Sequence, residues 1–278
     1  MNKKRIYVAY TGGTIGMQQS SNGFVPVPGF LSDTVKSMPE FYRSEMPEFD
    51  IHEYHPVIDS SDMTPAHWLE IATDIQSHYA DYDGFVVLHG TDTMAYTASA
   101  LSFMLENLQK PVIITGSQIP LAQMRSDGQV NLLNALYLAA NYPIAEVALF
   151  FNNQLFRGNR ATKADASGFN AFASPNFPVL LEAGIHINLI AGKLKTAGNA
   201  LPLQLATVIP QPISVVTLYP GISNDVIRNM TAAPVRALII KSFGVGNAPQ
   251  RPELLQILTE ASERGLIDGL TRSLAECT

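Results

Sequence analysis

The chain has 278 residues, of which 46% are apolar and 15% charged, which is the composition of a globular protein with one large domain or two smaller ones. Its net charge of −6, from 18 basic and 24 acidic residues, argues against nucleic acid as a partner. Because no apolar run approaches the length of a membrane span and the amino terminus does not resemble a signal peptide, we expect no membrane partner and a cytoplasmic location. The single cysteine, Cys277, excludes an internal disulfide.

Apolar runs alternate with amphipathic stretches up to about residue 151. The runs that predict strands are 5–10, 51–58, 84–88, 111–115 and 147–151, and the helical stretches begin after Thr64, cover 94–108 and surround 132–140. Residues 17–29, rich in Ser, Gly and Pro, predict an exposed flap, and 152–173 a loop or short hairpin. This alternation predicts an α/β fold, a parallel sheet flanked by helices in a Rossmann-like N-terminal domain.

The second part of the chain predicts a smaller α/β domain. Strands at 213–219 and 236–243 alternate with helices at 223–231 and 252–264, and beyond Gly265 too few apolar residues follow for a buried third strand. We therefore predict an incomplete, apparently truncated C-terminal domain. The predicted boundaries are 1–190 for the N-terminal domain, 191–210 for a linker and 211–278 for the C-terminal domain.

Two polar loops, 11–16 and 90–93, follow predicted strands and each carries a threonine. The carboxyl ends of adjacent parallel strands are where open α/β sheets bind ligands, so the loops predict one shared crevice. A Thr hydroxyl becomes a nucleophile when a neighbour accepts its proton and donors stabilise the oxyanion that forms. Asp92 and Lys163 could supply the acceptor, and backbone N–H groups beside Gly12 and Gly13 the donors. This pattern favours acyl transfer or amide hydrolysis.

Simpler interpretations exist for each of these residues. Thr14 and Asp92 could be helix caps, Lys163 a solvated loop lysine, and His89 a core histidine with satisfied hydrogen bonds. The glycines match neither a P-loop nor a dinucleotide-binding motif.

A metal site is also conceivable at His52, Glu53 and His55. They do not form H-E-x-x-H, and on a strand His52 faces the side opposite to the other two. We therefore predict no metal.

Two motifs carry a family resemblance. Tyr10–Gly16 together with Leu88–Met94 resembles the paired signature of the bacterial L-asparaginase family, and the rest of the chain resembles its cytosolic type I branch. The resemblance runs from residue 3 to about residue 265 and includes the motifs at 59–63, 115–118, 125–128, 162–163 and 244–247.

The resemblance implies an L-asparagine amidohydrolase that makes L-aspartate and ammonia without a metal or an organic cofactor. Thr14 matches the attacking threonine, and Thr91, Asp92 and Lys163 match a second catalytic group that handles water and protons. The residues that match the family's substrate-binding positions are Gly13, Ser60, Ser61, Gly90, Thr91, Asp92 and Asn247. The resemblance also implies a homodimer or homotetramer, and a possible effector site at Thr162 and Lys241.

The chain departs from the family pattern in two places. Phe24 stands where the family usually has a flap tyrosine, and the residues after about 265 do not match the family's continuation. These departures leave a non-catalytic amino-acid binder open as an alternative to the hydrolase. A second alternative is the amidotransferase subunit that acts on misacylated tRNA, because it shares the fold of this family.

Overall fold

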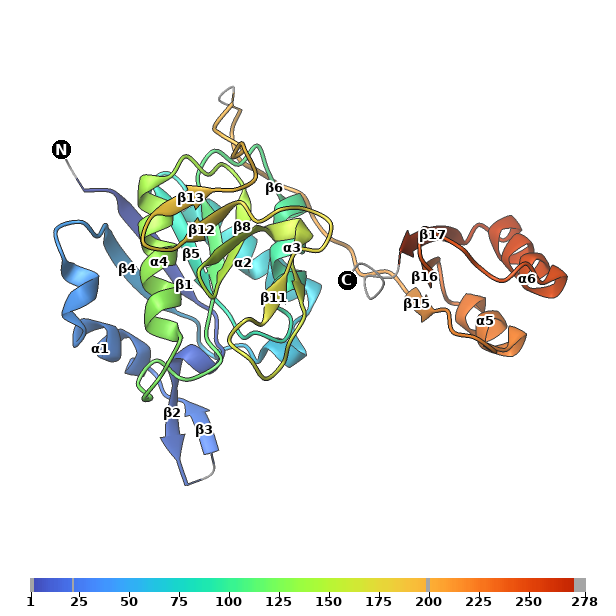
Figure 1. The fold of residues 1–278 in the computed structure, drawn as a ribbon, viewed down its shortest axis with the longest axis horizontal. Helices are drawn as coiled ribbons and strands as arrows, with labels where there is room; N and C mark the ends of the chain where they lie inside the picture. The colour runs from blue at the N-terminus through green and yellow to red at the C-terminus, as the bar shows by residue number, and fades with distance from the viewer. Residues whose placement is uncertain (1–2, 22, 199–200, 273–278) are drawn as a thin grey trace. The chain divides into compact units, whose positions relative to one another are not determined.

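The computed structural model describes residues 3–21, 23–198 and 201–272. The chain divides into two compact units, Met1–Val208 and Ile209–Thr278. The division falls inside the segment 191–210 that the sequence predicts as a linker. Figure 1 labels most of the helices and strands of the two units, which are described here one at a time.

The first unit is built on an eight-stranded sheet with the strand order β13-β12-β9-β8-β7-β5-β1-β4. Five of its strands are parallel, and they are β1 (Arg5–Tyr10), β4 (Glu48–Glu53), β5 (Gly84–Leu88), β7 (Val112–Thr115) and β8 (Val147–Phe151). Every residue of β5 and β8 is buried, as expected of parallel strands covered on both faces. The predicted α/β fold class is thus confirmed.

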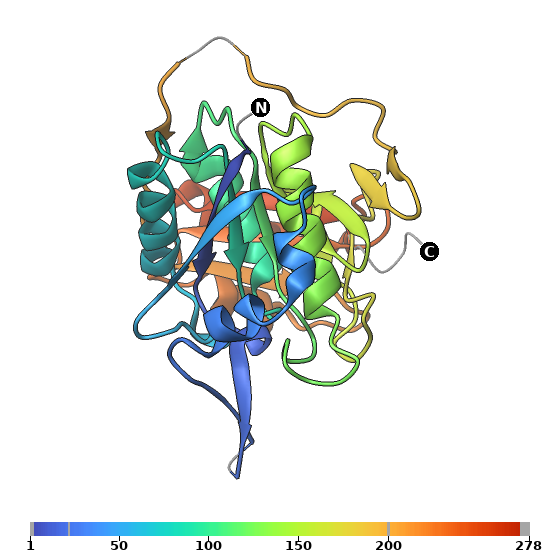
Figure 2. The same ribbon diagram turned by 90° about the vertical axis from the view of Figure 1, so that its left-hand side faces the viewer.

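Helices cover the two faces of this sheet. On one face α1 (Phe30–Lys36) and α4 (Gly128–Asn141) share a core with Ile6, Val8 and Tyr10 of β1. On the other face α2 (Pro65–Ser77) and α3 (Met94–Met104) share a core with Tyr7 and Ala9. The alternation along β1 follows from the two-residue period of a strand. In Figure 2 the blue α1 and the green α4 lie on the same side of the sheet.

The two helices on the second face differ in how well the sequence predicts their ends. At α2, the Thr64 hydroxyl accepts a hydrogen bond from the His67 amide at 3.5 Å and Pro65 occupies the first helical position, which confirms the predicted start. The predicted end of the next helix, at residue 108, is wrong, because α3 ends at Met104. Residues Leu105–Glu106 instead form β6, which pairs with β14 (Gln204–Leu205), a strand inside the predicted linker.

After β8 the strand–helix alternation stops, at the point where the sequence predicts a loop or short hairpin. Asn152 and Asn153, both with positive φ, turn the chain directly into β9 (Gln154–Arg157), which runs antiparallel to β8. The sheet then continues antiparallel through β12 (Leu181–Ala183) and β13 (Ile187–Leu189).

The predicted flap is an exposed hairpin of β2 (Met17–Ser20) and β3 (Gly23–Pro26). A short 3₁₀ helix, Pro39–Tyr42, lies between α1 and β4. In the described residues no helix is long and apolar enough to cross a membrane.

The second unit has three parallel strands, β15 (Ile213–Thr217), β16 (Ala237–Ser242) and β17 (Ile267–Arg272), with α5 (Asn224–Thr231) and α6 (Pro252–Glu263) between them. The prediction of only two strands is therefore wrong. β17 pairs along its whole length with the central strand β16, from Ala237↔Ile267 to Ser242↔Arg272. β17 lies at the edge of this sheet and is held by backbone hydrogen bonds to β16. An edge strand does not require the apolar run that we expected of a buried strand.

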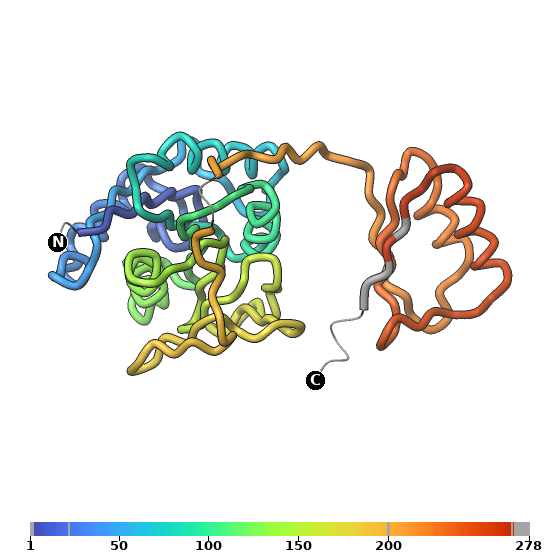
Figure 3. Tube along the Cα trace, turned by 90° about the horizontal axis from the view of Figure 1, so that it is seen from above, coloured from blue at the N-terminus to red at the C-terminus, as the bar shows by residue number. Residues whose placement is uncertain are grey.

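Both helices of the second unit pack on one face of its sheet. Ile227 of α5 and Leu254 and Ile257 of α6 share a core with Leu238 and Ile240 of β16. The opposite face carries apolar side chains that are half exposed, namely Ile213 at 52% and Val215 at 50%. Figure 3 shows the coils of the two helices on the same side of the strands.

Candidate active site

The two polar loops that follow β1 and β5 touch through their backbones. Gly13 has a φ of 94°, and a β carbon placed on it would lie 2.5 Å from the Gly90 nitrogen. A β carbon on Gly90 would lie 2.4 Å from the Ser60 Oγ. Three predicted substrate-binding residues, Gly13, Gly90 and Ser60, therefore lie side by side. Only glycine fits at the two loop positions, because any side chain would collide with the facing loop.

A third loop, at Ile58–Asp62, completes this contact. The Ile58 amide donates to the Thr11 carbonyl at 2.6 Å, and the Thr93 hydroxyl donates to the Ser60 carbonyl at 2.6 Å. Ser60 is only 5% exposed. Three loops at the carboxyl ends of β1, β4 and β5 are thus joined by one backbone hydrogen bond and one side-chain hydrogen bond.

Ser61 lies in the same loop but is exposed and bonded locally. It is the second residue of the 3₁₀ helix Ser60–Asp62, which Asp59 caps, and both its amide, at 2.8 Å, and its hydroxyl, at 2.9 Å, donate to Asp59 Oδ1. These two bonds, the amide first, hold the pKa of Asp59 below its usual range.

Thr14 begins the 3₁₀ helix Thr14–Gly16, directly after Gly13. It is half-buried, and its hydroxyl makes no hydrogen bond to any residue that the structure describes. The Tyr10 hydroxyl donates to the Gly13 carbonyl at 3.3 Å and so helps to fix the loop. The helix-cap interpretation of Thr14 is wrong, because Gly13 occupies the cap position.

Lys163 joins the loop that follows β5. Its Nζ lies 3.0 Å from the Thr91 Oγ1 and 2.7 Å from Asp92 Oδ1. The Lys163 side chain is 20% exposed, whereas that of Asp92 is 65% exposed. The solvated-lysine interpretation is therefore wrong. Asp92 is also no cap of α3, since Thr93 holds that position.

A short hairpin presents Lys163 to this loop. Lys163 lies in β10 (Thr162–Lys163), which follows the 3₁₀ helix Gly158–Arg160 and pairs with β11 (Phe172–Ala173). Phe172 is 2% exposed and packs edge-to-face on Phe151 of β8 with 5.1 Å between ring centroids. The lysine is thus anchored through a core aromatic on the neighbouring strand.

Gln118 is a neighbour of Thr91 that sequence reasoning did not include in the site. The Thr91 hydroxyl donates to Gln118 Oε1 at 3.2 Å, and Gln118 Nε2 donates to the Gly168 carbonyl at 2.9 Å. Both carboxylate oxygens of Asp127 accept from the backbone N–H of Gln118 at 3.0 Å. The available signal was its position in Gly116-Ser117-Gln118, which closes strand β7 just as the other site loops close theirs.

His89 is a buried residue that hydrogen-bonds to the Gly90 carbonyl. It is 1% exposed, its Nδ1 lies 2.7 Å from the Gly90 carbonyl and its Nε2 lies 2.9 Å from the Thr97 hydroxyl. A carbonyl can only accept, so Nδ1 carries the proton and Nε2 accepts from Thr97, which in turn accepts from the Trp68 indole at 3.0 Å. Burial lowers the pKa of His89 to about 4, which keeps this ring neutral. The predicted core role is confirmed.

The remaining predicted residues lie elsewhere in the chain. Thr162 is next to Lys163 in β10, whereas Lys241 in β16 and Asn247 are exposed residues of the second unit. Phe24 in β3 is 47% exposed. Their roles stay predictions. In the described part of the chain, no cluster of three or more His, Cys, Asp or Glu side chains is arranged to hold a metal ion.

A parallel α/β unit with a threonine loop packed against a threonine–aspartate loop is the arrangement expected of an asparaginase. The family described as "Asparaginase, N-terminal" matches residues 5–194. The chain belongs to the asparaginase family.

Within this family the chain is similar to L-asparaginase 1 of Escherichia coli, with 67% identity over 267 residues that cover 96% of this chain and 79% of that protein. The crystal structure of L-asparaginase I from Vibrio cholerae matches with a TM-score of 0.89 and 63% identity, covering 95% of this chain and 80% of that one. The 60 kDa lysophospholipase of Mus musculus is 43% identical over 286 residues, which cover 95% of this chain and 50% of that protein.

Proposed function

We propose that the protein hydrolyses L-asparagine to L-aspartate and ammonia. The observation that carries the proposal is the contact of Lys163 with Thr91 and Asp92, in a loop whose backbone touches the loop of Thr14. Membership of the asparaginase family supports the same reaction.

In the proposed first step the Thr14 oxygen attacks the side-chain amide carbon of asparagine. The Thr14 proton passes to the leaving nitrogen, the carbon–nitrogen bond breaks, and ammonia departs to leave an ester on Thr14. Backbone N–H groups beside Gly13 are the donors that would stabilise the oxyanion. The free hydroxyl of Thr14 in the described structure is consistent with this role.

In the proposed second step water attacks that ester and releases L-aspartate. The Thr91 oxygen orients the water, Lys163 takes a proton from it, and the same proton passes to the Thr14 oxygen as that oxygen leaves. Asp92 holds the lysine at 2.7 Å and, with most of its side chain exposed, has room to bind the α-ammonium of the substrate. Only the residues of the chain and a water molecule take part in these steps.

We also propose how the substrate is held. Ser60 and Ser61 bind the α-carboxylate, and Gly13 and Gly90 let the backbone approach the amide. Asn247 keeps the substrate-binding role that the family resemblance implies. Clamping both charged ends of asparagine converts binding energy into orientation over Thr14. Ser61 would have to exchange its bond to Asp59 for one to the substrate.

The assembly, regulation and location of the protein follow the family resemblance. We propose a homodimer or homotetramer, an effector site at Thr162 and Lys241, and a cytoplasmic location. Size-exclusion chromatography with light scattering measures the oligomeric state. If the effector site exists, the rate should depend cooperatively on the asparagine concentration, and Thr162→Ala should abolish this cooperativity.

Covalent trapping tests the reaction itself. Incubation with a diazo-ketone analogue of asparagine, followed by peptide mass spectrometry, should place one adduct on Thr14. The Thr14→Val variant should take up no label, whereas the Thr14→Ser variant, which keeps a hydroxyl, should retain part of the labelling. An unlabelled protein that binds asparagine by calorimetry would favour the non-catalytic binder instead.

Phe24 is the observation that favours the binder as a second candidate, because its ring has no hydroxyl to relay a proton. Phe24→Tyr should raise the acylation rate if such a relay limits the reaction. An unchanged rate in an active enzyme would assign the flap a steric role.

A further inference from the structure

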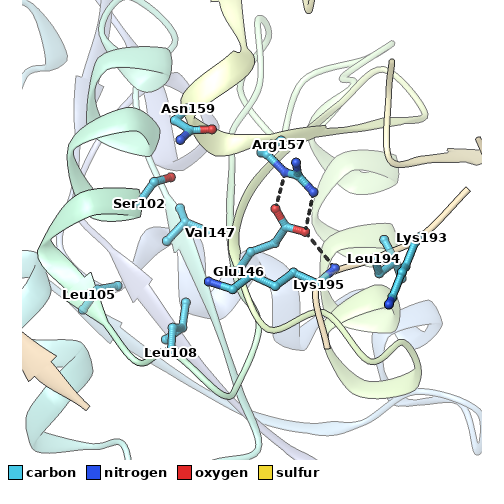
Figure 4. A pocket seen from close by; sticks show the side chains of 10 residues that line it. All are labelled: Ser102, Leu105, Leu108, Glu146, Val147, Arg157, Asn159, Lys193, Leu194 and Lys195. Atoms are coloured by element: carbon cyan, nitrogen blue, oxygen red, sulfur yellow. Dashed lines mark hydrogen bonds and ion pairs between the residues drawn. The ribbon is translucent and has the colours of Figure 1, made fainter. Parts of the chain in front are cut away.

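A pocket lies in the first unit, away from the candidate active site. Its volume is about 470 Å³, and Figure 4 shows the side chains that line it. Glu146 and Val147 place it at the amino end of β8, whereas the candidate catalytic loops follow the carboxyl ends of their strands. Leu105, Leu108 and Leu194 form its apolar wall. The pocket is therefore a separate site with its own chemistry.

A buried ion pair fixes one wall of this pocket. The Glu146 side chain is 8% exposed and accepts from Arg157 Nε at 2.6 Å and Nη2 at 3.3 Å. It also accepts from the Lys195 amide at 3.2 Å, and the Arg157 guanidinium lies 4.4 Å above the centre of the Phe177 ring. This wall is preorganised and carries no net charge, because the glutamate and the arginine neutralise each other.

Two lysines give the pocket an excess of positive charge. In Figure 4 the Lys195 side chain extends across the pocket, beyond the Glu146–Arg157 pair. Its ammonium makes no ion pair or hydrogen bond with any residue of the described chain, and Lys193 adds a second cation to the lining. In a chain of net charge −6, this local excess of cations favours an anionic ligand.

An unpaired polar atom lies in the same lining. Asn159 Oδ1 is buried and has no hydrogen-bond partner among the described residues. A buried acceptor without a donor is costly and rare in native proteins, so a bound molecule with a donor group would explain it. Ser102, which donates to the Ala98 carbonyl at 2.7 Å, adds an oxygen that can accept.

We propose that this pocket binds a small hydroxylated oxyanion, with its charged group at Lys195, its hydroxyl at Asn159 and its carbon body on the leucines. Phosphate esters of small polyols and hydroxy-carboxylates share this chemistry. The proposal does not rest on the proposed asparagine hydrolysis, because the residues of the two sites are different.

Titration calorimetry on the full chain tests the ligand class with two matched pairs. Glycerol 3-phosphate is compared with propyl phosphate, and citrate with propane-1,2,3-tricarboxylate, so that each pair differs in hydroxyl groups. We expect the hydroxylated member of at least one pair to bind about tenfold or more tightly than its partner. Binding by only one pair identifies the source as phosphate or carboxylate. Failure of both hydroxylated probes at millimolar concentration, or equal binding within each pair, overturns the proposal.

Three variants locate the binding. Lys195→Gln should weaken it by about 10- to 100-fold, and Asn159→Leu should abolish the preference for the hydroxylated probe. Lys36→Gln, a matched lysine on α1, should bind as the parent does. Lys195→Arg should keep most of the affinity, and thermal melting monitored by circular dichroism confirms that each variant is folded. Unchanged binding in folded Lys195→Gln overturns the assignment to this pocket.

Discussion

The two units of the chain bury their parallel strands in different ways. In the first unit all five residues of β5 and of β8 are buried, because helices cover both faces of the sheet. In the second unit only Val216 of the five residues in β15 is buried, because α5 and α6 cover one face. A continuous apolar run therefore identifies a strand covered on both faces, and a half-covered strand gives a weaker signal.

The units also differ in their predicted chemistry, because the candidate catalytic residues lie in the first unit. Substitution of a lysine in this site is the test with the largest expected effect. Lys163→Met should lower kcat for asparagine on the order of 10²–10⁴-fold, since a positioned proton acceptor is lost. Arg228→Met, which removes an exposed cation from α5 in the second unit, should keep kcat. Ammonia release measured at saturating asparagine gives both values. Equal losses in the two variants would contradict a site centred on the first unit.

Core truncations should separate the two kinds of strand burial. Leu149→Ala in β8 should lower the free energy of unfolding of the first unit by about 2–5 kcal/mol, because the leucine is fully buried. Ile213→Ala in β15 should cost the second unit less than about 0.5 kcal/mol, because half of that side chain is exposed. Urea unfolding monitored by circular dichroism measures both. A loss of similar size for Ile213→Ala would mean that another surface covers the outer face of that sheet.

The stability of the first unit should depend on pH through His89. Its folded pKa of about 4 lies below the ordinary value of 6.5, so between these values the unfolded chain takes up a proton that the folded chain does not. The stabilising contribution is complete above pH 6.5 and declines as the pH falls to 4, by up to about 3 kcal/mol. Urea unfolding at pH 7 and pH 4.5 measures this decline. His89→Gln should show a smaller decline, and an unchanged one would assign it to other groups.

Helix caps should give small and equal effects in the two units. Thr64 caps α2 and Ser223 caps α5, each by accepting a backbone hydrogen bond, at 3.5 Å and 3.3 Å. Either residue changed to Ala should cost its own unit about 1 kcal/mol. Thermal unfolding by differential scanning calorimetry resolves this change. A much larger effect for Ser223→Ala would show that α5 has less tertiary support than α2.

The sequence predicts the elements of the first unit well where local signals are strong. The runs at 5–10 and 84–88 coincide with β1 and β5, and the Thr64-Pro65 pair marks the start of α2. It fails at Met104 and at β17, where pairing with a distant strand decides the structure and local composition does not.

The candidate site shows the same limit. Clustered Gly, Thr and Asp residues at strand ends identify two of its loops, but no local signal brings Lys163 or Gln118 to Thr91. Lys163 reaches Thr91 only because Phe172 packs on Phe151, and Gln118 only because β7 pairs beside β5. Such contacts depend on tertiary packing, so the family resemblance supplied Lys163, and the position of Gln118 at the end of β7 is the signal that points to the glutamine.

The near-contact of Gly13 with Gly90 has a consequence for how this enzyme would respond to random mutation. Neither glycine has a side chain that could take part in a reaction, yet a methyl group on Gly13 would overlap with the Gly90 backbone, and one on Gly90 would overlap with Ser60. A screen for lost activity would therefore score both positions as severely as the nucleophile. Intolerance to substitution at this site thus measures how closely two loops meet as well as which groups react.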